Sequence, residues 1–238
     1  MPDIRLLDEP MWSALTTTQS SYATGTGLAR AYLPAIGPLS GLAEQTPAAY
    51  DDLHRLAAPN AVQVLFLHEP PVPRIGWTLI RGGLVDQMVF AGSPQSIVDE
   101  SGNERATGPT NMRLLTAADV PAMVELATLT EPGPFRDRTH ELGTFYGIFE
   151  DSRLLSMAGQ RMRVPGYIEV SAVCTHPDAR GRGYARMLMS TVMRLILNSG
   201  DTPFLHTFAD NLSAIRVYHA LGFKKRLTFH LAVLKKNS

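Results

Sequence analysis

A glycine-bearing loop constrains the fold of the C-terminal half of this chain more than any other feature. It lies between a segment rich in β-forming residues and a segment whose apolar residues recur at helical spacing. Residues 167–175 are rich in β-forming side chains, and residues 184–197 repeat Leu, Met, Val and Ile at helical spacing. The loop between them reads Arg180, Gly181, Arg182, Gly183, Tyr184 and Ala185. A helix that begins in such a loop offers backbone N–H donors and the positive end of its dipole to an anion. The pattern predicts a strand–loop–helix unit that can cradle a diphosphate.

The spacing of this loop differs from that of the two classical nucleotide loops. No Gly-Lys-Ser/Thr follows, as an NTPase loop requires, and the glycines do not fit Gly-x-Gly-x-x-Gly. Gly181 and Gly183 allow the backbone to approach phosphate oxygens, and Arg180 and Arg182 add positive charge. For the segment taken in isolation, a turn that serves geometry alone is an equal alternative.

Further strands and helices alternate around the loop. Strands are predicted at residues 111–115, 144–149, 154–162, 204–208 and 226–234. One helix is predicted after a capping box formed by Thr116 and Asp119, and another at residues 212–221. The C-terminal half therefore combines strands and helices in one unit.

A polar, Gly- and Pro-bearing stretch after Phe90 is expected to be a linker, which divides the chain into domains at residues 1–105 and 106–238. In the first domain, strands are predicted at residues 62–67, 75–80 and 84–90, with turns at 70–73 and at Gly82-Gly83. Residues 16–40 give only weak helical signals. The order of helices followed by a meander resembles the start of the second domain, so a degenerate second copy is expected.

The length, charge balance and cysteine count argue against several classes of protein. With 238 residues, 45% of them hydrophobic, the chain is long enough to bury a sizeable core. The 22 basic residues balance the 22 acidic ones, which argues against a global attraction to nucleic acid or to an anionic membrane. The single cysteine, Cys174, excludes an intramolecular disulfide, and no run resembles a leader or a membrane span. We expect a soluble cytoplasmic protein.

Two motifs together point to a family. The loop follows a β-rich run ending at Thr175, and a later segment beginning at Asn211 reads Asn-x-x-Ala-x-x-x-Tyr-x-x-x-Gly-Phe. From about Met112 to its end, the chain resembles the GNAT superfamily of N-acetyltransferases. The resemblance implies an α/β (α+β) fold with a central mixed, mostly antiparallel sheet flanked by helices, here preceded by a smaller α/β domain. It also implies acetyl-CoA as the co-substrate.

The resemblance assigns binding roles to residues of this chain. Val173, Cys174 and Thr175 end a strand that is expected to splay from its neighbour and to pair, through peptide groups alone, with the pantetheine arm of CoA. Cys174 is then a small buried apolar residue and not a nucleophile. The loop 180–185 is expected to bind the diphosphate. The first domain contains no second such loop, so one CoA site per chain is expected.

Two residues are candidates for the chemistry. Asn211 and Tyr218 lie two turns apart on one face of the same helix, which is expected to meet the thiol region of CoA, with Asn211 as a cofactor-binding residue. Tyr218 is at the position that protonates the departing sulfur in many members; a packed ring is the alternative. Glu169 matches the position of the general base in the histone-modifying members. On an alternating strand it shares a side with Ser171 and Val173, where burial is expected to raise its pKa. A strand glutamate without a catalytic role is an equal alternative.

The remaining candidates carry less weight. His206 and His219 lack the spacing of metal ligands, so no metal is expected. Four arginines are interpreted as solvated surface residues in preference to the lining of a pocket for an anionic acceptor: Arg161, Arg163, Arg136 and Arg138.

The predicted function is transfer of an acetyl or short acyl group from acetyl-CoA to a small-molecule or peptide amine, by direct attack in a ternary complex. The protein is expected to act as a monomer or homodimer that binds neither nucleic acid nor membrane. One alternative is a GNAT-like sensor or interaction module that binds CoA without catalysis, and another makes the first domain an independent partner-binding unit. The residues that choose the amine are expected in the loops around residues 129–142 and at the face between the two domains, and their sequence does not identify the acceptor.

Overall fold

The computed structural model describes residues 2–72, 74–93 and 111–238 of the chain. The described helices are α1 (Pro10–Thr16), α2 (Pro47–Leu56), α3 (Val120–Thr130), α4 (Tyr184–Asn198) and α5 (Leu212–Ala220). The described strands are β1 (Ala23–Thr24), β2 (Ala29–Tyr32), β3 (Ser40–Leu42), β4 (Val62–Leu67), β5 (Trp77–Phe90), β6 (Met112–Leu114), β7 (Phe145–Glu150), β8 (Arg153–Val164), β9 (Tyr167–Thr175), β10 (Thr202–Phe208) and β11 (Phe223–Lys236). Apart from residues 91–93, the predicted linker lies outside the described residues, as does the boundary at 105/106. Within the described part, no helix is long and apolar enough to cross a bilayer.

The elements of the C-terminal half begin and end close to the predicted residues. Strand β9 spans residues 167–175 and helix α4 starts at Tyr184, both as predicted. The predicted capping box forms before α3, where Asp119 Oδ2 accepts a hydrogen bond from the Thr116 N–H at 2.8 Å. These boundaries follow from local caps, turn residues and apolar spacing, which a sequence displays directly.

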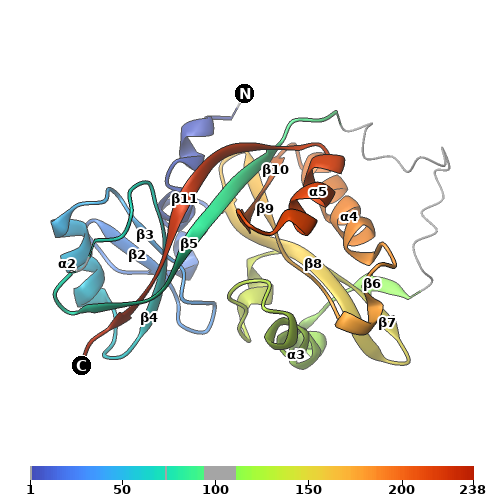
Figure 1. Cartoon of the computed structure of the whole chain (residues 1–238), viewed down its shortest axis with the longest axis horizontal. Helices are drawn as coiled ribbons and strands as arrows, with labels where there is room; N and C mark the ends of the chain where they lie inside the picture. The colour runs from blue at the N-terminus through green and yellow to red at the C-terminus, as the bar shows by residue number, and fades with distance from the viewer. Residues whose placement is uncertain (1, 73, 94–110) are drawn as a thin grey trace.

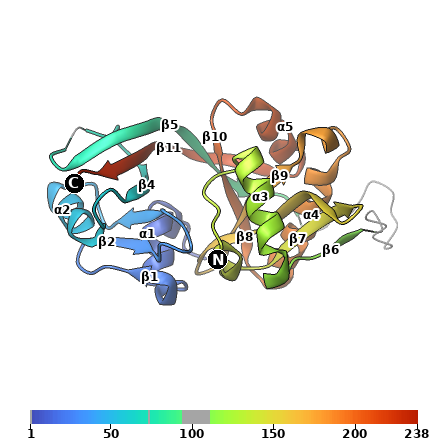
Figure 2. The ribbon, with the colours of Figure 1, turned by 90° about the horizontal axis from the view of Figure 1, so that it is seen from below.

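One eight-stranded sheet runs through both halves of the molecule, in the order β4-β11-β5-β10-β9-β8-β7-β6. Its neighbouring strands are antiparallel except for β9 and β10, which are parallel. Helices α4 and α5 cover one face of the C-terminal part, and α3 covers the other (Figures 1 and 2). The predicted fold class, a mixed and mostly antiparallel sheet flanked by helices, is confirmed.

The strands β5 and β11 pass from one half of the molecule to the other (Figure 1). Their antiparallel ladder runs from the pair Phe223↔Phe90 to the pair Lys236↔Trp77. At one end β5 also pairs with β10, and at the other end β11 also pairs with β4. Each half of the chain thus contributes a strand to the other half's part of the sheet. The two predicted domains share this sheet, and their division at residue 105 stays a prediction.

The pair Gly82-Gly83 lies inside β5, so the predicted turn between two separate strands is wrong. The ladder with β11 continues through both glycines, opposite Ala232 and Leu231. A Cβ atom at Gly83 would lie 3.5 Å from the ring of Phe208. That distance is an ordinary contact, so the space around Gly83 does not demand glycine, and the two glycines do not reverse the chain.

The N-terminal half repeats the order of elements of the C-terminal half. Helix α1, the antiparallel strands β1 to β3, helix α2 and strand β4 follow one another, as α3, β7 to β9, α4 and β10 do. The bridge Leu39↔Val64 links the small sheet of β1 to β3 with β4. Residues 43–46, which lead into α2, contain no glycine. The connection before α2 therefore has no counterpart of the glycine-bearing loop at residues 180–185 before α4.

Two local predictions for the N-terminal half need correction. Residues 16–40 form mainly short strands and turns after α1. Helix α2 was not predicted, although Thr46 caps it by accepting a hydrogen bond from the Ala49 N–H and Pro47 stands at its first position. This pairing of an N-cap with a following proline is a standard helix-start signal.

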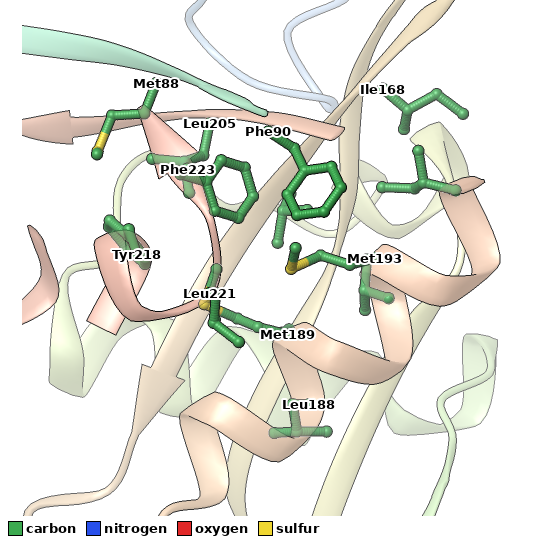
Figure 3. Close-up of a cluster of buried hydrophobic side chains, with 14 of the residues drawn as sticks. Met88, Phe90, Ile168, Leu188, Met189, Met193, Leu205, Tyr218, Leu221 and Phe223 are labelled. Carbon is green, nitrogen blue, oxygen red and sulfur yellow. The ribbon is translucent and has the colours of Figure 1, made fainter. Parts of the chain in front are cut away.

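Buried apolar clusters join the helices to the sheet and the two halves to each other. One cluster lies between α4, α5 and the sheet and contains Phe90, Phe223 and Tyr218 (Figure 3). Another lies between the halves, where Leu15 of α1 and Met162 of β8 belong to the same buried cluster. Phe90 comes from β5, so the N-terminal half completes the core under α4.

Because β5 lies between β10 and β11, we expect residues 111–238 alone not to fold. Without β5, the facing edges of β10 and β11 lose their shared neighbour and Phe90 leaves the core. Circular dichroism and calorimetry should show one cooperative transition for the full chain and none for the fragment. As a control, a chain cleaved at a protease site placed within residues 94–110 should still unfold cooperatively, because both pieces are present. A cooperative transition of the fragment alone would contradict this prediction.

Candidate functional site

The site starts at a fork between the two parallel strands of the sheet. β9 pairs with β10 only through Tyr167, Ile168 and Glu169, opposite residues 202–204. Beyond Glu169, residues 170–175 of β9 have no partner on the side of β10 within the described sheet. Their peptide groups on that side are free to pair with a ligand, because an unpaired strand edge presents alternating N–H and C=O groups.

A β-bulge at Ala172 redirects the side chains of β9 at the fork. Ala172 has a φ of +51°, and two residues of β9 stand between the pairs Gly159↔Ser171 and Met157↔Cys174, where β8 has one. The bulge shifts the alternation, so Val173 packs in the cluster under α4. The prediction that Val173 shares a side with Glu169 is therefore wrong, because strict alternation does not survive a bulge.

The phosphate loop has the geometry that a diphosphate needs. Gly181 and Gly183 have φ values of +79° and +76°, and a Cβ atom at either would meet nothing within 4 Å. Gly183 caps α4 without a side-chain hydrogen bond, and the first turn of α4 contains no acidic residue. The side chain of Arg180 is exposed and has no partner among the described residues. The residues present therefore fit a diphosphate at the N-terminus of α4.

Glu150, at the end of β7, fixes one side of this loop. Its carboxylate accepts hydrogen bonds from Arg182 Nη1 at 2.8 and 3.0 Å and from the Tyr184 hydroxyl at 2.7 Å. Arg182 is thus held by an acid, which leaves Arg180 as the unpaired cation of the loop. The sequence analysis did not single out Glu150, because nothing in a strand end indicates which distant loop it will meet.

The fork opens into a cleft of about 560 Å³ between the two halves of the molecule. From the C-terminal half it is lined by Arg161, Ser171, Ala172, Val173, Asn211 and Tyr218. From the N-terminal half it is lined by Leu39, Val62, Val64, Phe66, Arg81 and Val85. The structure thus brings together Val173, Asn211 and Tyr218, which the sequence analysis placed in one site. The inter-domain face was expected to help choose the amine, but the sequence analysis named none of these residues of the N-terminal wall.

Tyr218 projects from α5 into the cluster between α4, α5 and the sheet (Figure 3). Burial raises the pKa of its hydroxyl to about 12, so the hydroxyl stays protonated at neutral pH. The hydroxyl has no hydrogen-bond partner among the described residues. Asn211 caps α5, and its Oδ1 accepts hydrogen bonds from the Ala214 N–H and the Ser213 hydroxyl. Asn211 therefore sets where α5 begins, and with it the position of Tyr218.

Glu169 lies in a fully bonded network under the cleft. Its Oε2 and Oε1 accept hydrogen bonds from Nε and Nη2 of Arg161, each at 2.8 Å, and Oε2 also accepts the Met162 N–H. Only 1% of the Glu169 residue is exposed. The guanidinium of Arg161 holds the pKa of this carboxyl below its usual range despite the burial. The expected upward pKa shift is wrong, because the carboxylate is buried together with its counter-charge. Arg161 is likewise buried and not solvated.

His206 of β10 completes this network. Its Nδ1 lies 2.8 Å from Glu169 Oε1, and its Nε2 lies 3.2 Å from Gln87 Nε2 of β5. Burial lowers the pKa of His206, so the ring is neutral at pH 7. In that form Nδ1–H donates to Glu169 and Nε2 accepts from Gln87. The network ties β8, β9, β10 and β5 together across the fork.

Comparison with known proteins identifies the family. Residues 145–231 match the family model described as FR47-like protein. A structure from Novosphingobium aromaticivorans, assigned to the acetyltransferases of the GNAT family, is 36% identical in sequence; the match covers 98% of this chain and 99% of that chain, with a TM-score of 0.86. The chain belongs to the GNAT family. A search of curated proteins found no match.

Two more distant structures share the fold of this GNAT protein. A GCN5-related N-acetyltransferase-like protein from Streptococcus suis is 16% identical, with 98% of this chain and 96% of that chain covered and a TM-score of 0.60. A tandem GNAT protein from the clavulanic acid biosynthesis pathway is 15% identical, with 87% and 77% covered and a TM-score of 0.52. At these identities the similarity concerns the fold alone, and it extends over both halves of the chain.

The remaining predicted residues of the GNAT site lie along β9. Val173, Cys174 and Thr175 are the last residues of the strand and stand beyond its pairing with β10. The Cys174 side chain is buried, and burial raises the pKa of its thiol to about 11. A thiol with that pKa is protonated and unreactive at neutral pH. Among the described residues, no three His, Cys, Asp or Glu side chains are grouped as metal ligands.

The buried network of Glu169 should contribute strongly to stability. We expect Glu169→Gln to lower the free energy of unfolding by about 3–5 kcal/mol, because Arg161 is left buried without its counter-charge. The matched control is Glu150→Gln, which breaks an exposed arginine pair worth about 0–1 kcal/mol. Urea unfolding at pH 7 measures both variants.

The difference in the free energy of unfolding between wild type and Glu169→Gln should decrease as the pH is lowered. The pKa of Glu169 is lowered on folding from an ordinary value of 4.5. Its stabilising contribution is therefore complete above that pH and is lost as pH falls towards the folded-state pKa. A difference of under 1 kcal/mol at pH 7 would show that the pair does not stabilise the fold.

Proposed function

We propose that this protein transfers an acetyl or short acyl group from acetyl-CoA to an amine, by direct attack in a ternary complex. The observation that carries the proposal is the fork between β9 and β10. The fork opens into the cleft that contains Tyr218, and its strand β9 is followed in the chain by the loop 180–185 at the start of α4. Membership of the GNAT family supports the same chemistry.

CoA would be held along β9 and at the start of α4. The backbone N–H groups of the loop 180–185 would bind the diphosphate, with Arg180 supplying charge, since the loop is open and its helix end is uncapped by a side chain. The peptide groups of Val173, Cys174 and Thr175 would pair with the pantetheine arm in the fork. CoA when bound would supply the thioester, whose acyl carbon is the electrophile.

The transfer needs one proton donor and one proton acceptor. The amine nitrogen attacks the thioester carbon, a C–N bond forms, the C–S bond breaks, and the thiolate of CoA leaves. We assign the proton for the thiolate to Tyr218, because this residue lines the cleft and its protonated hydroxyl has no partner among the described residues. The amine loses one proton in the same reaction, which balances the proton given to sulfur.

The acceptor of the amine proton is a separate assignment. Glu169 was the predicted base, but its oxygens accept bonds from Arg161, Met162 and His206 and its pKa is lowered. We therefore propose that water in the cleft takes the proton from the amine, and that Glu169 positions Arg161 and β9.

Binding of acetyl-CoA tests the phosphate loop. We expect isothermal calorimetry to detect binding to wild type, and Gly183→Asp to weaken it at least tenfold, about 1.4 kcal/mol, by placing bulk and negative charge in the cradle. Gly200→Asp is the matched control, because Gly200 also has a positive φ of +82° with nothing within 4 Å of its Cβ, but lies at the far end of α4. Equal affinities of the two variants would remove the loop from the site.

The role of Tyr218 separates an enzyme from a CoA-binding sensor. We expect Tyr218→Phe to lower kcat about 100- to 10,000-fold with acetyl-CoA binding unchanged, since only the proton donor is lost. Tyr50→Phe, which removes another buried hydroxyl outside the cleft, should leave kcat within twofold. Amine-dependent release of free CoA thiol is the measurement. Binding of acetyl-CoA without turnover of any amine would favour the sensor.

A further inference from the structure

The N-terminal wall of the cleft is a mostly apolar face of three strands. The registers of β4, β11 and β5 place Val64, Val233 and Arg81 in one row across the wall. The next row contains Phe66, Leu231 and Gly83. Apart from Gly83, these residues line the cleft. Because residues directly opposite in a sheet have Cβ atoms about 5 Å apart, Arg81 borders the apolar rows directly.

Arg81 is an unpaired cation in this wall. Its guanidinium carbon lies 5.0 Å from the ring centre of Phe208, another residue of the cleft. Its guanidinium has no acidic partner among the described residues. Stacking on a ring holds a guanidinium in place and leaves its planar fork of N–H donors free.

The other two charged residues of the cleft differ from Arg81. The charge of Arg161 is balanced by the two hydrogen bonds to Glu169. Glu131 follows the end of α3 in the C-terminal wall, and its carboxylate has no partner among the described residues. The described lining therefore contains one free cation in the N-terminal wall and one free anion in the C-terminal wall.

From this arrangement we infer that the amine acceptor is an amino acid with an apolar side chain. Its carboxylate binds Arg81, its side chain lies on the rows of Val64 and Phe66, and its amino group faces the side of the cleft that contains Glu131. The inference rests on the proposed acyl transfer and adds the substrate class.

The chemistry of the wall favours this class over two others. A dianionic phosphate would bring one negative charge more than Arg81 balances and would meet Glu131 in the same cleft. A polar or highly charged amine would lose its hydration against Val64, Phe66 and Leu231 without hydrogen bonds in return. A zwitterion with an apolar side chain matches both the charges and the wall, and a carboxylate is the planar group that an arginine fork binds in a bidentate manner.

The test compares amino acids with the same compounds lacking the carboxylate. The probes are leucine and phenylalanine against 3-methylbutylamine and 2-phenylethylamine, with kcat/KM measured by release of free CoA thiol. We expect wild type to prefer the amino acid of each pair about 10- to 100-fold, as a charge-assisted hydrogen bond predicts. Arg81→Gln should remove the preference by raising KM for the amino acids, with the values for the simple amines unchanged.

The matched control is Arg30→Gln. Arg30 also stacks on a ring, with its guanidinium carbon 5.2 Å from the ring centre of Trp12, but it is not part of the cleft lining. This variant should keep the preference for amino acids. An equal loss of kcat/KM for both members of each pair in Arg81→Gln would overturn the inference, as would a wild type that prefers the simple amines.

A binding measurement separates this inference from the proposed reaction. In calorimetry with the protein saturated by CoA, leucine should bind more tightly than 3-methylbutylamine to wild type and no more tightly to Arg81→Gln. That result without any turnover would reject the acyl transfer and support the amino acid site. Turnover of simple amines with no preference for amino acids would support the acyl transfer and reject the amino acid site.

Discussion

The antiparallel ladder of β5 and β11 is the interaction on which the rest of the structure depends. It joins the two halves because each strand is long enough to pair in both, from Phe90 at one end to Trp77 at the other. At one end it supplies Phe90 to the core under α4. Between its two ends it supplies Arg81 and Leu231 to the wall of the cleft. The half that carries the proposed CoA site and the proposed acceptor wall are therefore joined by one sheet.

The fork beside this ladder results from two departures from regular sheet geometry. The strands β9 and β10 pair for only a short distance and then separate. Within the separated part, the bulge at Ala172 sends Val173 to the face of α4 while Cys174 packs under α3. A regular sheet would have closed this edge with backbone hydrogen bonds. The early separation of β9 from β10 leaves backbone donors and acceptors of β9 unpaired along the fork.

Burial acts on the two predicted catalytic residues in opposite ways. Tyr218 is buried without a counter-charge, so its pKa rises to about 12 and its proton is retained. Glu169 is buried in contact with Arg161 and His206, so its pKa falls and its carboxylate stays ionised. Both residues are hidden from solvent, and the difference between them is the presence of a cation within hydrogen-bond distance. Burial alone therefore did not predict the direction of the pKa shift of Glu169.

The sequence by itself determined the elements of the C-terminal half, the open glycine loop before α4 and the family, because caps, glycines with positive φ and apolar spacing act over a few residues. It indicated Tyr218 and Asn211 for the same reason, since both lie in one short motif. It did not determine that Gly82-Gly83 continues a strand, that Arg161 pairs with Glu169, or that Arg81 faces the same cleft as Tyr218. Those facts depend on which strands pair and in which register. Register is decided by contacts between residues far apart in the chain, so only the tertiary structure settled them.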